Sequence, residues 1–337
     1  MKIVRTDSEI ACPIIDDELR AMGADLVLMP EDITEDQLAQ EVVDADLLLM
    51  CYTPITRRVI ERAPRLKGII KYGVGIDAID MEAAIEHGIP VVNIPEYAEE
   101  TVAEGAFCLM IALAKRLVPM HNEMQTNGWF WPEADWRGLD IAGKTVGVLG
   151  AGKIGRSFAR MAGAGFRARV IGYDPHVSTN DMAAAGIEKF TELHEFLNQC
   201  DFVSLHCVLH PETRGIIGKA EFEAMKPTAF LINTSRGGLV DQEALMDALH
   251  NNEIAGAGLD VFVDEPLTQD GHQLSALYDM ENVLILPHVT FLTHESMERL
   301  ERETLERCRE ILEGRQTLVK SGDPRLRAQS RGVRFQD

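Results

Sequence analysis

The sequence predicts an α/β protein with two doubly wound, Rossmann-like domains, each built on a parallel sheet. Two observations predict this fold class. Short apolar segments alternate with amphipathic ones over residues 1–97, and the same alternation returns over residues 143–288. Alternating strands and helices are typical of parallel sheets that helices cover on both faces. A length of 337 residues also suits about two domains, each with its own core.

The first block predicts five strands separated by helices. Its strand segments are short and rich in Val, Ile and Leu, as buried parallel strands are. We expect strands at 2–6, 25–29, 46–51, 68–72 and 90–93, with helices at 16–22, 35–43, 57–62 and 81–87. A long apolar helix over 101–117 follows, and its small residues allow close packing against another helix or domain.

The segment 128–138 is irregular and carries all three tryptophans of the chain. One interpretation is a loop pinned by buried aromatic rings, because large rings are usually placed in a core. The other is a wall of the active site or of a subunit interface. The sequence alone leaves both open.

The second block predicts strands at 146–149, 169–172, 202–206, 229–233, 258–261 and 283–286. A final helix over 294–313 has one apolar face. A single helix cannot form a domain, so we expect it to fold back onto residues 1–97. The first domain would then be discontinuous, with residues 1–98 and 289–337 flanking an inserted domain of residues 99–288. The arginine-rich tail over 314–337 is interpreted as a loosely held extension or a subunit arm.

A glycine-rich turn follows the strand at 146–149 and matches G-x-G-x-x-G. Gly150 allows the tight turn, Gly152 lets the backbone approach a pyrophosphate, and Gly155 lets helix and strand pack closely. The N–H groups at the start of the next helix can bind phosphate. Asp174 ends the following strand, where a carboxylate can accept hydrogen bonds from the adenosine ribose and repel a 2′-phosphate. The sequence therefore predicts an NAD site.

A second phosphate-binding pattern is misleading. Residues 138–145 match G-x-x-x-x-G-K-[ST] letter by letter. That loop needs a strand before it and a helix beginning at its Lys-Thr pair. Here Lys144 and Thr145 lead into a strand, so an NTPase site is not expected.

Composition excludes several classes of protein. With 33 Lys and Arg against 54 Asp and Glu, the formal charge of −21 opposes nonspecific binding to nucleic acid or an anionic membrane. No apolar run approaches the length of a membrane helix, and the N-terminus lacks the apolar core of a secretory signal. Six scattered cysteines without a C-x-x-C pair indicate reduced thiols in a cytoplasmic protein, and no metal site is predicted.

Polar residues follow three predicted strands of the second block. Arg236 comes after 229–233, the acidic residues Asp264 and Glu265 come after 258–261, and His288 comes after 283–286. Ligands of open α/β sheets bind beyond the carboxyl ends of the strands. A guanidinium suits a bidentate hold on a carboxylate, and a histidine with a carboxylate beside it can transfer a proton near neutral pH. Alternatively, Arg236 forms a structural salt bridge and His288 is a structural histidine.

At this point the chain resembles the D-isomer-specific 2-hydroxyacid dehydrogenase family over all but about its last 20 residues. The resemblance rests on the glycine fingerprint and on motifs dispersed along the chain. These are Tyr72–Asp77 (YGVGID), Val102–Glu104 (VAE), Tyr173–Pro175 (YDP), Pro211–Gly215 (PETRG), Asn233–Asp241 (NTSRGGLVD), Gly258–Phe262 (GLDVF), Glu265–Pro266 and Pro287–His288.

The resemblance implies a flavodoxin-like substrate-binding domain interrupted by a Rossmann NAD domain, and hydride transfer between nicotinamide C4 and C2 of a 2-hydroxy or 2-keto acid. Arg236 would bind the substrate carboxylate, and His288 would act as general acid/base with Glu265 as its partner. The backbone N–H groups of Val74 and Gly75 would hold the carboxylate from the substrate domain. Closure of the cleft would exclude water.

The resemblance also implies an NAD site, in which Asp260 positions the nicotinamide carboxamide while Thr234 and Ser235 line the cofactor. The full set of cofactor-binding candidates is Gly150, Gly152, Lys153, Ile154, Gly155, Tyr173, Asp174, Pro175, Cys207, Val208, Thr213, Thr234, Ser235, Arg236, Asp260 and His288. The substrate-binding candidates are Tyr52, Val74, Gly75, Arg236 and His288.

Some residues depart from the family pattern. Val289–Thr293 is bulkier than usual, and Phe291 either narrows the pocket or packs against the final helix. Cys51-Tyr52-Thr53 lacks the arginine of the phosphoglycerate branch, which puts a phosphorylated substrate in doubt. Glu265 argues against formate oxidation, where relatives carry an amide. Tyr52, Lys71 and the tryptophan segment are candidates for substrate selection, whereas a packed ring and a solvated charge are the plain alternatives for the first two.

Two functions remain open on this fold. The first is an NAD-dependent dehydrogenase or 2-keto acid reductase acting on a small molecule. The second is an NAD(H)-binding regulatory or redox-sensing protein, and phosphite oxidation is a minor third. The resemblance implies a homodimer, with the helix at 101–117 and the tryptophan segment as contact candidates.

Overall fold

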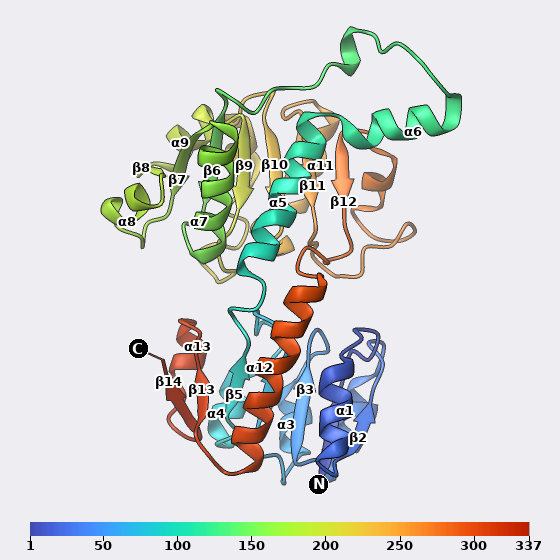
Figure 1. The fold of residues 1–337 in the computed structure, drawn as a ribbon, viewed down its shortest axis with the longest axis vertical. Coiled ribbons are helices and arrows are strands. Elements are labelled where there is room, and N and C mark those ends of the chain that lie inside the picture. Colours follow the sequence, from blue (N-terminus) through green and yellow to red (C-terminus); the bar gives the residue numbers. More distant parts are fainter. Residues whose placement is uncertain (337) are drawn as a thin grey trace. The chain divides into compact units, whose positions relative to one another are not determined.

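The computed structural model describes residues 1–336. The chain forms two compact units (Figure 1). The first unit contains Met1–Ala98 and the chain from Thr293 onward, and the second contains Glu99–Leu292. Both units hold parallel sheets, so the predicted α/β class with two doubly wound sheets is confirmed. Within the described residues, no helix is long and apolar enough to cross a membrane.

The first unit contains a five-stranded parallel sheet in the order β2-β1-β3-β4-β5. The sequence predicts all five strands to within about two residues, because runs such as Leu47–Met50 are apolar at every position and completely buried. The strands are β1 (Lys2–Arg5), β2 (Asp25–Leu28), β3 (Leu47–Met50), β4 (Ile69–Lys71) and β5 (Val91–Asn93), and the helices between them are α1 (Pro13–Ala21), α2 (Glu35–Glu41), α3 (Arg57–Glu61) and α4 (Met81–Glu86).

The final helix, α12 (His294–Leu312), packs against α1 and β4 of this unit. Its apolar face, which includes Leu300 and Leu305, is buried, as the sequence predicts. A polar contact adds to the packing, because the carboxylate of Glu301 accepts hydrogen bonds from the N–H groups of Ile14 and Ile15 at 2.7 and 3.1 Å. These two donors lie in the first turn of α1, where helix N–H groups lack intrahelical partners.

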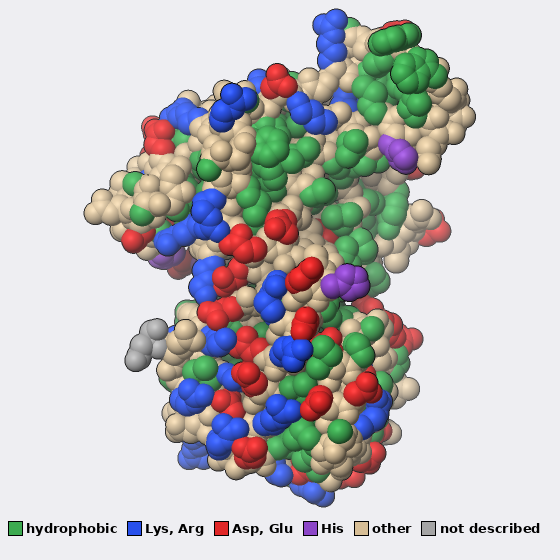
Figure 2. All heavy atoms as spheres, viewed as in Figure 1, with side chains coloured by type: hydrophobic (Ala, Val, Ile, Leu, Met, Phe, Trp, Pro, Cys, Tyr) green, Lys and Arg blue, Asp and Glu red, His purple; other side chains and the backbone are tan. Residues whose placement is uncertain are grey.

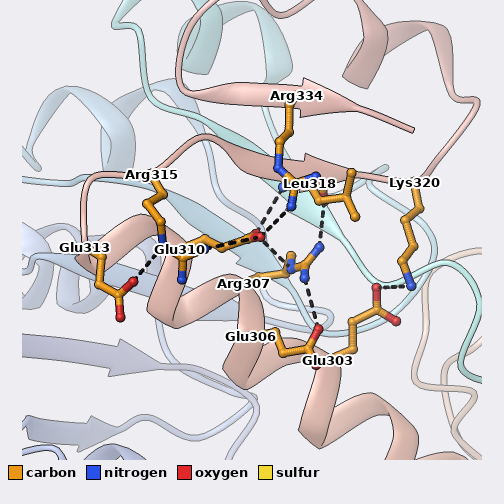
Figure 3. Close-up of polar contacts among 9 residues, drawn as sticks. All are labelled: Glu303, Glu306, Arg307, Glu310, Glu313, Arg315, Leu318, Lys320 and Arg334. Atoms are coloured by element: carbon orange, nitrogen blue, oxygen red, sulfur yellow. Dashed lines mark hydrogen bonds and ion pairs between the residues drawn. The ribbon is translucent and has the colours of Figure 1, made fainter. Parts of the chain in front are cut away.

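The tail is not a loosely held extension, so that interpretation is wrong. Residues Thr317–Val319 (β13) and Val333–Phe335 (β14) pair in parallel, with a short helix, α13 (Pro324–Arg327), between them. Figure 3 shows how α12 and this tail segment are joined through Glu310, which is 4% exposed. Its carboxylate contacts Arg307 at 3.1 Å and Arg334 at 2.8 Å and accepts the N–H of Leu318 at 3.1 Å.

The tail also pairs with the sheet edge through one side chain. The amide of Gln329 accepts from the N–H of Val91 at 2.7 Å and donates to its carbonyl at 2.9 Å, as a neighbouring strand would. Gln329 is buried, and so are Val319, Leu326 and Val333. The tail is therefore part of the core of the first unit.

The second unit contains a seven-stranded parallel sheet in the order β12-β11-β10-β9-β6-β7-β8. Its strands are β6 (Thr145–Leu149), β7 (Arg169–Tyr173), β8 (Glu188–Phe190), β9 (Phe202–Leu205), β10 (Phe230–Asn233), β11 (Gly256–Leu259) and β12 (Val283–Ile285). Sequence analysis missed β8, an exposed edge strand, and placed β11 two residues late. Gly256 and Ala257 give a weak strand pattern, and the shift leaves Asp260 just beyond the strand instead of within it.

Helices cover both faces of this sheet. They are α5 (Glu99–Ala114), α7 (Lys153–Arg160), α8 (Thr179–Ala184), α9 (Leu193–Gln199), α10 (Lys219–Ala224) and α11 (Gln242–His250), whereas α6 (Leu117–Asn127) follows α5 and extends away from the sheet (Figure 1). One apolar cluster joins α5 and α7 to the sheet around Phe107 and Phe158, whose rings meet edge to face at 5.9 Å. A second cluster joins α9, α10 and α11 to the other face.

The predicted helix over 101–117 is broken in the structure. α5 ends at Ala114, and Arg116 adopts φ 49° before α6 begins. No residue of α6 is buried. The side chains of Trp129 and Trp131 are 77% and 84% exposed, so a loop pinned by buried rings is wrong for these two. Figure 2 shows hydrophobic side chains gathered on the face of the second unit that carries α5 and α6.

Candidate active site

The site is built at the carboxyl ends of three neighbouring strands of the second unit. Arg236 follows β10, Asp260 follows β11 and His288 follows β12, and these strands are adjacent in the sheet. Parallel strands all end at the same edge of a sheet, where ligands of α/β proteins bind. The sheet order therefore brings together three residues separated by 24 to 52 positions in the sequence.

The acid/base candidates form a hydrogen-bonded pair. The Nδ1 atom of His288 lies 2.8 Å from Oε2 of Glu265, while Oε1 of Glu265 accepts the N–H of Phe262 at 2.8 Å. Burial alone raises the pKa of Glu265, but the hydrogen bond and charge of His288, the Phe262 N–H and the charge of Arg236 outweigh it and lower that pKa below its usual value. Glu265 is therefore a carboxylate at neutral pH.

Asp260 fixes the turn that carries His288. Its carboxylate is completely buried and accepts three hydrogen bonds, from the N–H of Val289 at 2.7 Å and from the N–H and hydroxyl of Thr290 at 2.9 and 2.6 Å. His288 itself has φ 58°, in the left-handed region that few residues adopt. The contacts of Asp260 stabilise this conformation. Contact with a nicotinamide carboxamide stays a prediction for Asp260.

The loop after β10 is shaped by Asn233, a role that sequence analysis missed. Its side chain accepts from the N–H of Ser235 at 3.0 Å and donates to the carbonyl of Arg236 at 2.9 Å. An Asn followed by a small hydroxyl residue is a known turn signal, and this could have revealed it. A Cβ at Gly237 would lie 2.0 Å from the carbonyl carbon of Phe262, so only glycine allows this loop to approach the 262–265 loop.

The glycine turn has the conformation that a dinucleotide site needs. Gly150 has φ 96°, and a Cβ at Gly155 would lie 2.2 Å from the Gly150 carbonyl oxygen. A Cβ at Gly152, in contrast, would meet no atom within 4 Å, so the backbone is open there to an incoming group. Gly152 is the N-cap of α7, and Lys153, Ile154 and Gly155 form its first turn. These three observations fit a pyrophosphate at this helix end.

The other cofactor-binding candidates follow strands that end at the same edge of the sheet. Tyr173 ends β7, and the carboxylate of Asp174 accepts from the N–H groups of Ala151, His176 and Val177 at 2.9, 2.9 and 3.2 Å. Asp174 is thus anchored to the glycine turn, and Pro175 follows it. The remaining candidates come after β9 or β10, namely Cys207, Val208, Thr213, Thr234 and Ser235.

Two of these candidates have distinct environments. Thr213 donates its hydroxyl hydrogen bond to the carbonyl of Val208 at 2.6 Å, which closes the loop after β9. The Thr234 hydroxyl is buried and has no hydrogen-bond partner within the part of the chain that the structure describes. A buried hydroxyl without a partner is unfavourable, and a bound ligand can supply the partner.

The substrate candidates of the first unit lie at the ends of β3 and β4. Tyr52 follows β3 and is half-buried, while Val74 and Gly75 form the loop after β4. The side chain of Asn93 donates to the carbonyl of Val74 at 2.6 Å and so orients that peptide. Whether Val74 and Gly75 bind a substrate carboxylate stays a prediction.

The known proteins that match this chain belong to one family. Residues 107–290 match the model of the D-isomer specific 2-hydroxyacid dehydrogenase NAD-binding domain. A glyoxylate reductase of Korarchaeum cryptofilum is 40% identical over 266 residues, 78% of either chain. A D-3-phosphoglycerate dehydrogenase of Methanocaldococcus jannaschii is 37% identical over 283 residues, 84% of this chain and 52% of the relative. The chain thus spans about half the length of that phosphoglycerate relative.

Solved structures of similar proteins match the fold of this chain over most of its length. A protein from Thermus thermophilus matches with a TM-score of 0.84 and 34% identity, covering 94% of this chain and 98% of that one. A D-lactate dehydrogenase of Aquifex aeolicus, solved with NAD and lactic acid, matches with a TM-score of 0.81 and 29% identity over 93% and 96% of the two chains. Together with the glycine turn and the strand-end residues, these matches show that the chain belongs to the D-isomer-specific 2-hydroxyacid dehydrogenase family, whose cofactor is NAD.

Proposed function

We propose that this protein transfers a hydride between NAD(H) and C2 of a small D-2-hydroxy or 2-keto acid. The observation that carries the proposal is the Glu265–His288 pair, with Arg236 following a neighbouring strand of the NAD-binding sheet. In the reductive direction, a 2-keto acid, NADH and one proton give the 2-hydroxy acid and NAD⁺. Glyoxylate and lactate appear in the names of relatives, which supports substrates of this size.

Each residue of the chain has a defined part in this reaction. Bound NADH supplies the hydride. Arg236 holds the substrate carboxylate through its guanidinium, and His288 gives its proton to the keto oxygen. Glu265 orients the imidazole through Nδ1. Asp260 keeps the His288 turn in place.

The two units divide the work in this proposal. Residues 99–288 bind NAD, and residues 1–98 with 289–337 bind the substrate, where the N–H groups of Val74 and Gly75 hold its carboxylate. The retained acid/base pair disfavours a purely regulatory role. A regulator needs NAD binding but no proton transfer.

The test is an NADH-oxidation assay of the purified protein with a panel of 2-keto acids. We expect turnover of at least one of glyoxylate, pyruvate, hydroxypyruvate, oxaloacetate, 3-sulfopyruvate and 3-phosphohydroxypyruvate, measured as loss of NADH absorbance. NADH binding is measured in parallel by fluorescence. A protein that binds NADH tightly but oxidises none of it across the panel contradicts the proposal and favours the regulatory alternative.

The pH dependence of reduction gives a second test. Replacing Glu265 by Gln keeps an oxygen for the Phe262 N–H but removes the negative charge beside His288. Without that charge the imidazole is oriented by a weaker hydrogen bond, so we expect the neutral rate of reduction to fall about tenfold.

The acid limb of the kcat/KM profile shows whether the charge of Glu265 is needed for reduction. The pKa of Glu265 is lowered, so in the wild type this carboxyl is protonated only below its usual range, and reduction falls as the pH drops through that lowered value. The Glu265→Gln variant has no carboxyl to titrate and should lack this acid limb. Identical profiles for the two proteins would show that Glu265 has no part in proton transfer.

We further propose a homodimer formed through α5, α6 and the tryptophan segment. An apolar surface on α5 and its neighbours includes Phe107, Ile111, Leu117 and Met161, and Trp129 and Trp131 are strongly exposed. Exposed patches of this kind mark protein interfaces. Replacing both tryptophans by Ser should convert a dimer to a monomer in light scattering, whereas Leu292→Ser, also an exposed apolar residue, should leave the mass unchanged. A wild-type monomer contradicts the proposal.

A further inference from the structure

Lys71 is a buried cation without a carboxylate partner. It ends β4 and is 5% exposed. Its ammonium donates to the carbonyl oxygen of Cys51, contacts the Sγ atom of the same residue at 3.2 Å and lies 4.9 Å from the centre of the Tyr52 ring. No carboxylate of the described residues forms an ion pair with it.

Arg5, at the end of β1, shows how this unit treats another buried cation. Its guanidinium is 1% exposed and makes two hydrogen bonds of 2.8 Å to the carboxylate of Asp16. Burying a charge is unfavourable unless an opposite charge compensates for it. A carbonyl, a sulfur atom and an aromatic ring offer Lys71 only partial negative charge. The positive charge of Lys71 is therefore compensated best by an anion that does not belong to the chain.

The position of Lys71 suggests where such an anion comes from. A Cβ placed on Gly73 would lie 3.0 Å from the Lys71 ammonium nitrogen, so the ammonium adjoins the backbone that leads to Val74 and Gly75. Asn93, the register partner of Lys71 on β5, holds the carbonyl of Val74. Its Oδ1 atom is buried without a hydrogen-bond partner in residues 1–336. An ammonium donor and an unpaired acceptor thus flank the loop that we propose to bind the substrate carboxylate.

We propose that Lys71, with Tyr52 against it, is a specificity residue that selects 2-keto acids carrying a second anionic group: a carboxylate, sulfonate or phosphate on C3. This inference rests on the proposed function. The chain has a formal charge of −21, so a dianionic substrate needs positive charge concentrated at its binding site. The Cys51-Tyr52-Thr53 segment after β3 brings no cation of its own, and Lys71 on the next strand supplies it.

The test compares dianionic with monoanionic substrates in the wild type and in Lys71→Met, whose side chain keeps much of the length without the charge. The substrates with a second anionic group, called dianions for short, are oxaloacetate, 3-sulfopyruvate and 3-phosphohydroxypyruvate, whose phosphate adds a further partial charge. The monoanions are pyruvate and hydroxypyruvate. We expect the wild type to prefer at least one dianion. Lys71→Met should lower kcat/KM for it by about 10- to 100-fold, the effect of one hydrogen bond to a charged group, and for the monoanions by less than about threefold.

Two further variants make the result specific. Lys71→Arg keeps a cation and should retain part of the preference for the dianion. Lys67→Met removes an exposed lysine of the same unit, paired with Asp46 at 3.2 Å, and should change neither substrate class. A thermal unfolding curve of each variant separates loss of recognition from loss of fold. Equal losses for both classes in Lys71→Met, with its unfolding temperature unchanged, would mean that Lys71 only holds the Cys51 carbonyl.

Binding measurements separate this inference from the proposed function. Calorimetric titration with the same dianions, in the presence of NADH, measures affinity whether or not turnover occurs. If the dianions bind in a way that depends on Lys71 but are not turned over, the anion-binding role of Lys71 is supported and the proposed oxidoreductase function is contradicted. If only monoanions are turned over and no dianion binds, the proposed oxidoreductase function is supported and the specificity role of Lys71 is contradicted.

Discussion

Replacing His288 by Asn is expected to lower kcat for 2-keto acid reduction by about three orders of magnitude, the usual range for loss of a general acid. Asparagine is the appropriate replacement because His288 has φ 58°, and Asn tolerates the left-handed region better than most residues. An alanine there would mix the loss of the proton donor with a change of the backbone. The Asp260 contacts to Val289 and Thr290 are made by that backbone and should persist in the variant.

The measurement is steady-state kinetics together with NADH titration. NADH affinity should stay within about threefold, because the contribution of His288 is to the transition state and not to the bound ground state. His250→Asn is a matched control, since that ring is exposed at the end of α11 and its Nδ1 atom lies 2.7 Å from the carbonyl oxygen of Met246 in the same helix. A loss of less than about tenfold in His288→Asn would remove this residue from the proton transfer.

Much of the fold is predictable from the sequence because it depends on local patterns. Buried runs such as Leu47–Met50 and the turn from Gly150 to Gly155 carry their own signal, and parallel sheets place the residue after each strand at a common edge. That is enough to nominate Arg236 and His288 with the acidic segment after 258–261, and the family resemblance then selects Glu265 from that segment. It also identifies Asp174, whose distance from the glycine turn is characteristic.

The parts that the sequence did not predict depend on partners far along the chain. The tail has five arginines in 314–337 and was expected to be a loosely held extension or a subunit arm, but Arg334 pairs with Glu310, a carboxylate 24 positions earlier that is buried on α12. β8 is half-exposed and charged, so it lacks the apolar pattern of a parallel strand, and only its pairing with β7 defines it.

The same reasoning applies within the candidate site. Asp260 was nominated for a contact with the cofactor, which stays a prediction, but its hydrogen bonds to Val289 and Thr290, about 30 positions away, were not predicted. Nothing in the sequence near Asp260 indicates those N–H groups as partners. For Trp129 and Trp131 the sequence left open a buried loop and a wall of the active site or of an interface, and the structure leaves both residues strongly exposed. Residue type predicts that a side chain is buried only where other residues of the same chain pack against it.

Replacing Arg236 by Ala is expected to lower kcat/KM for every 2-keto acid by about 10³-fold, because two charge-assisted hydrogen bonds to the carboxylate would be lost. Arg236→Lys should recover only part of this, since an ammonium cannot make the bidentate contact. The loop itself should survive, because Asn233 holds the backbone of Ser235 and Arg236 and not the guanidinium. Arg169→Gln, which removes a surface pair with Glu188 at 2.8 Å, is the control and should leave kcat/KM unchanged.

The pH profile distinguishes a direct role for Arg236 from a general disturbance. The charge of Arg236 helps to lower the pKa of Glu265, after the larger effects of burial and of His288. Without the guanidinium that pKa rises towards its usual value, so Glu265 is protonated at a higher pH than in the wild type. The acid limb of the residual activity of Arg236→Ala should therefore move up, whereas in Arg169→Gln it should not. An unchanged limb with an unchanged kcat/KM would mean that Arg236 is a structural residue and that another group holds the substrate carboxylate.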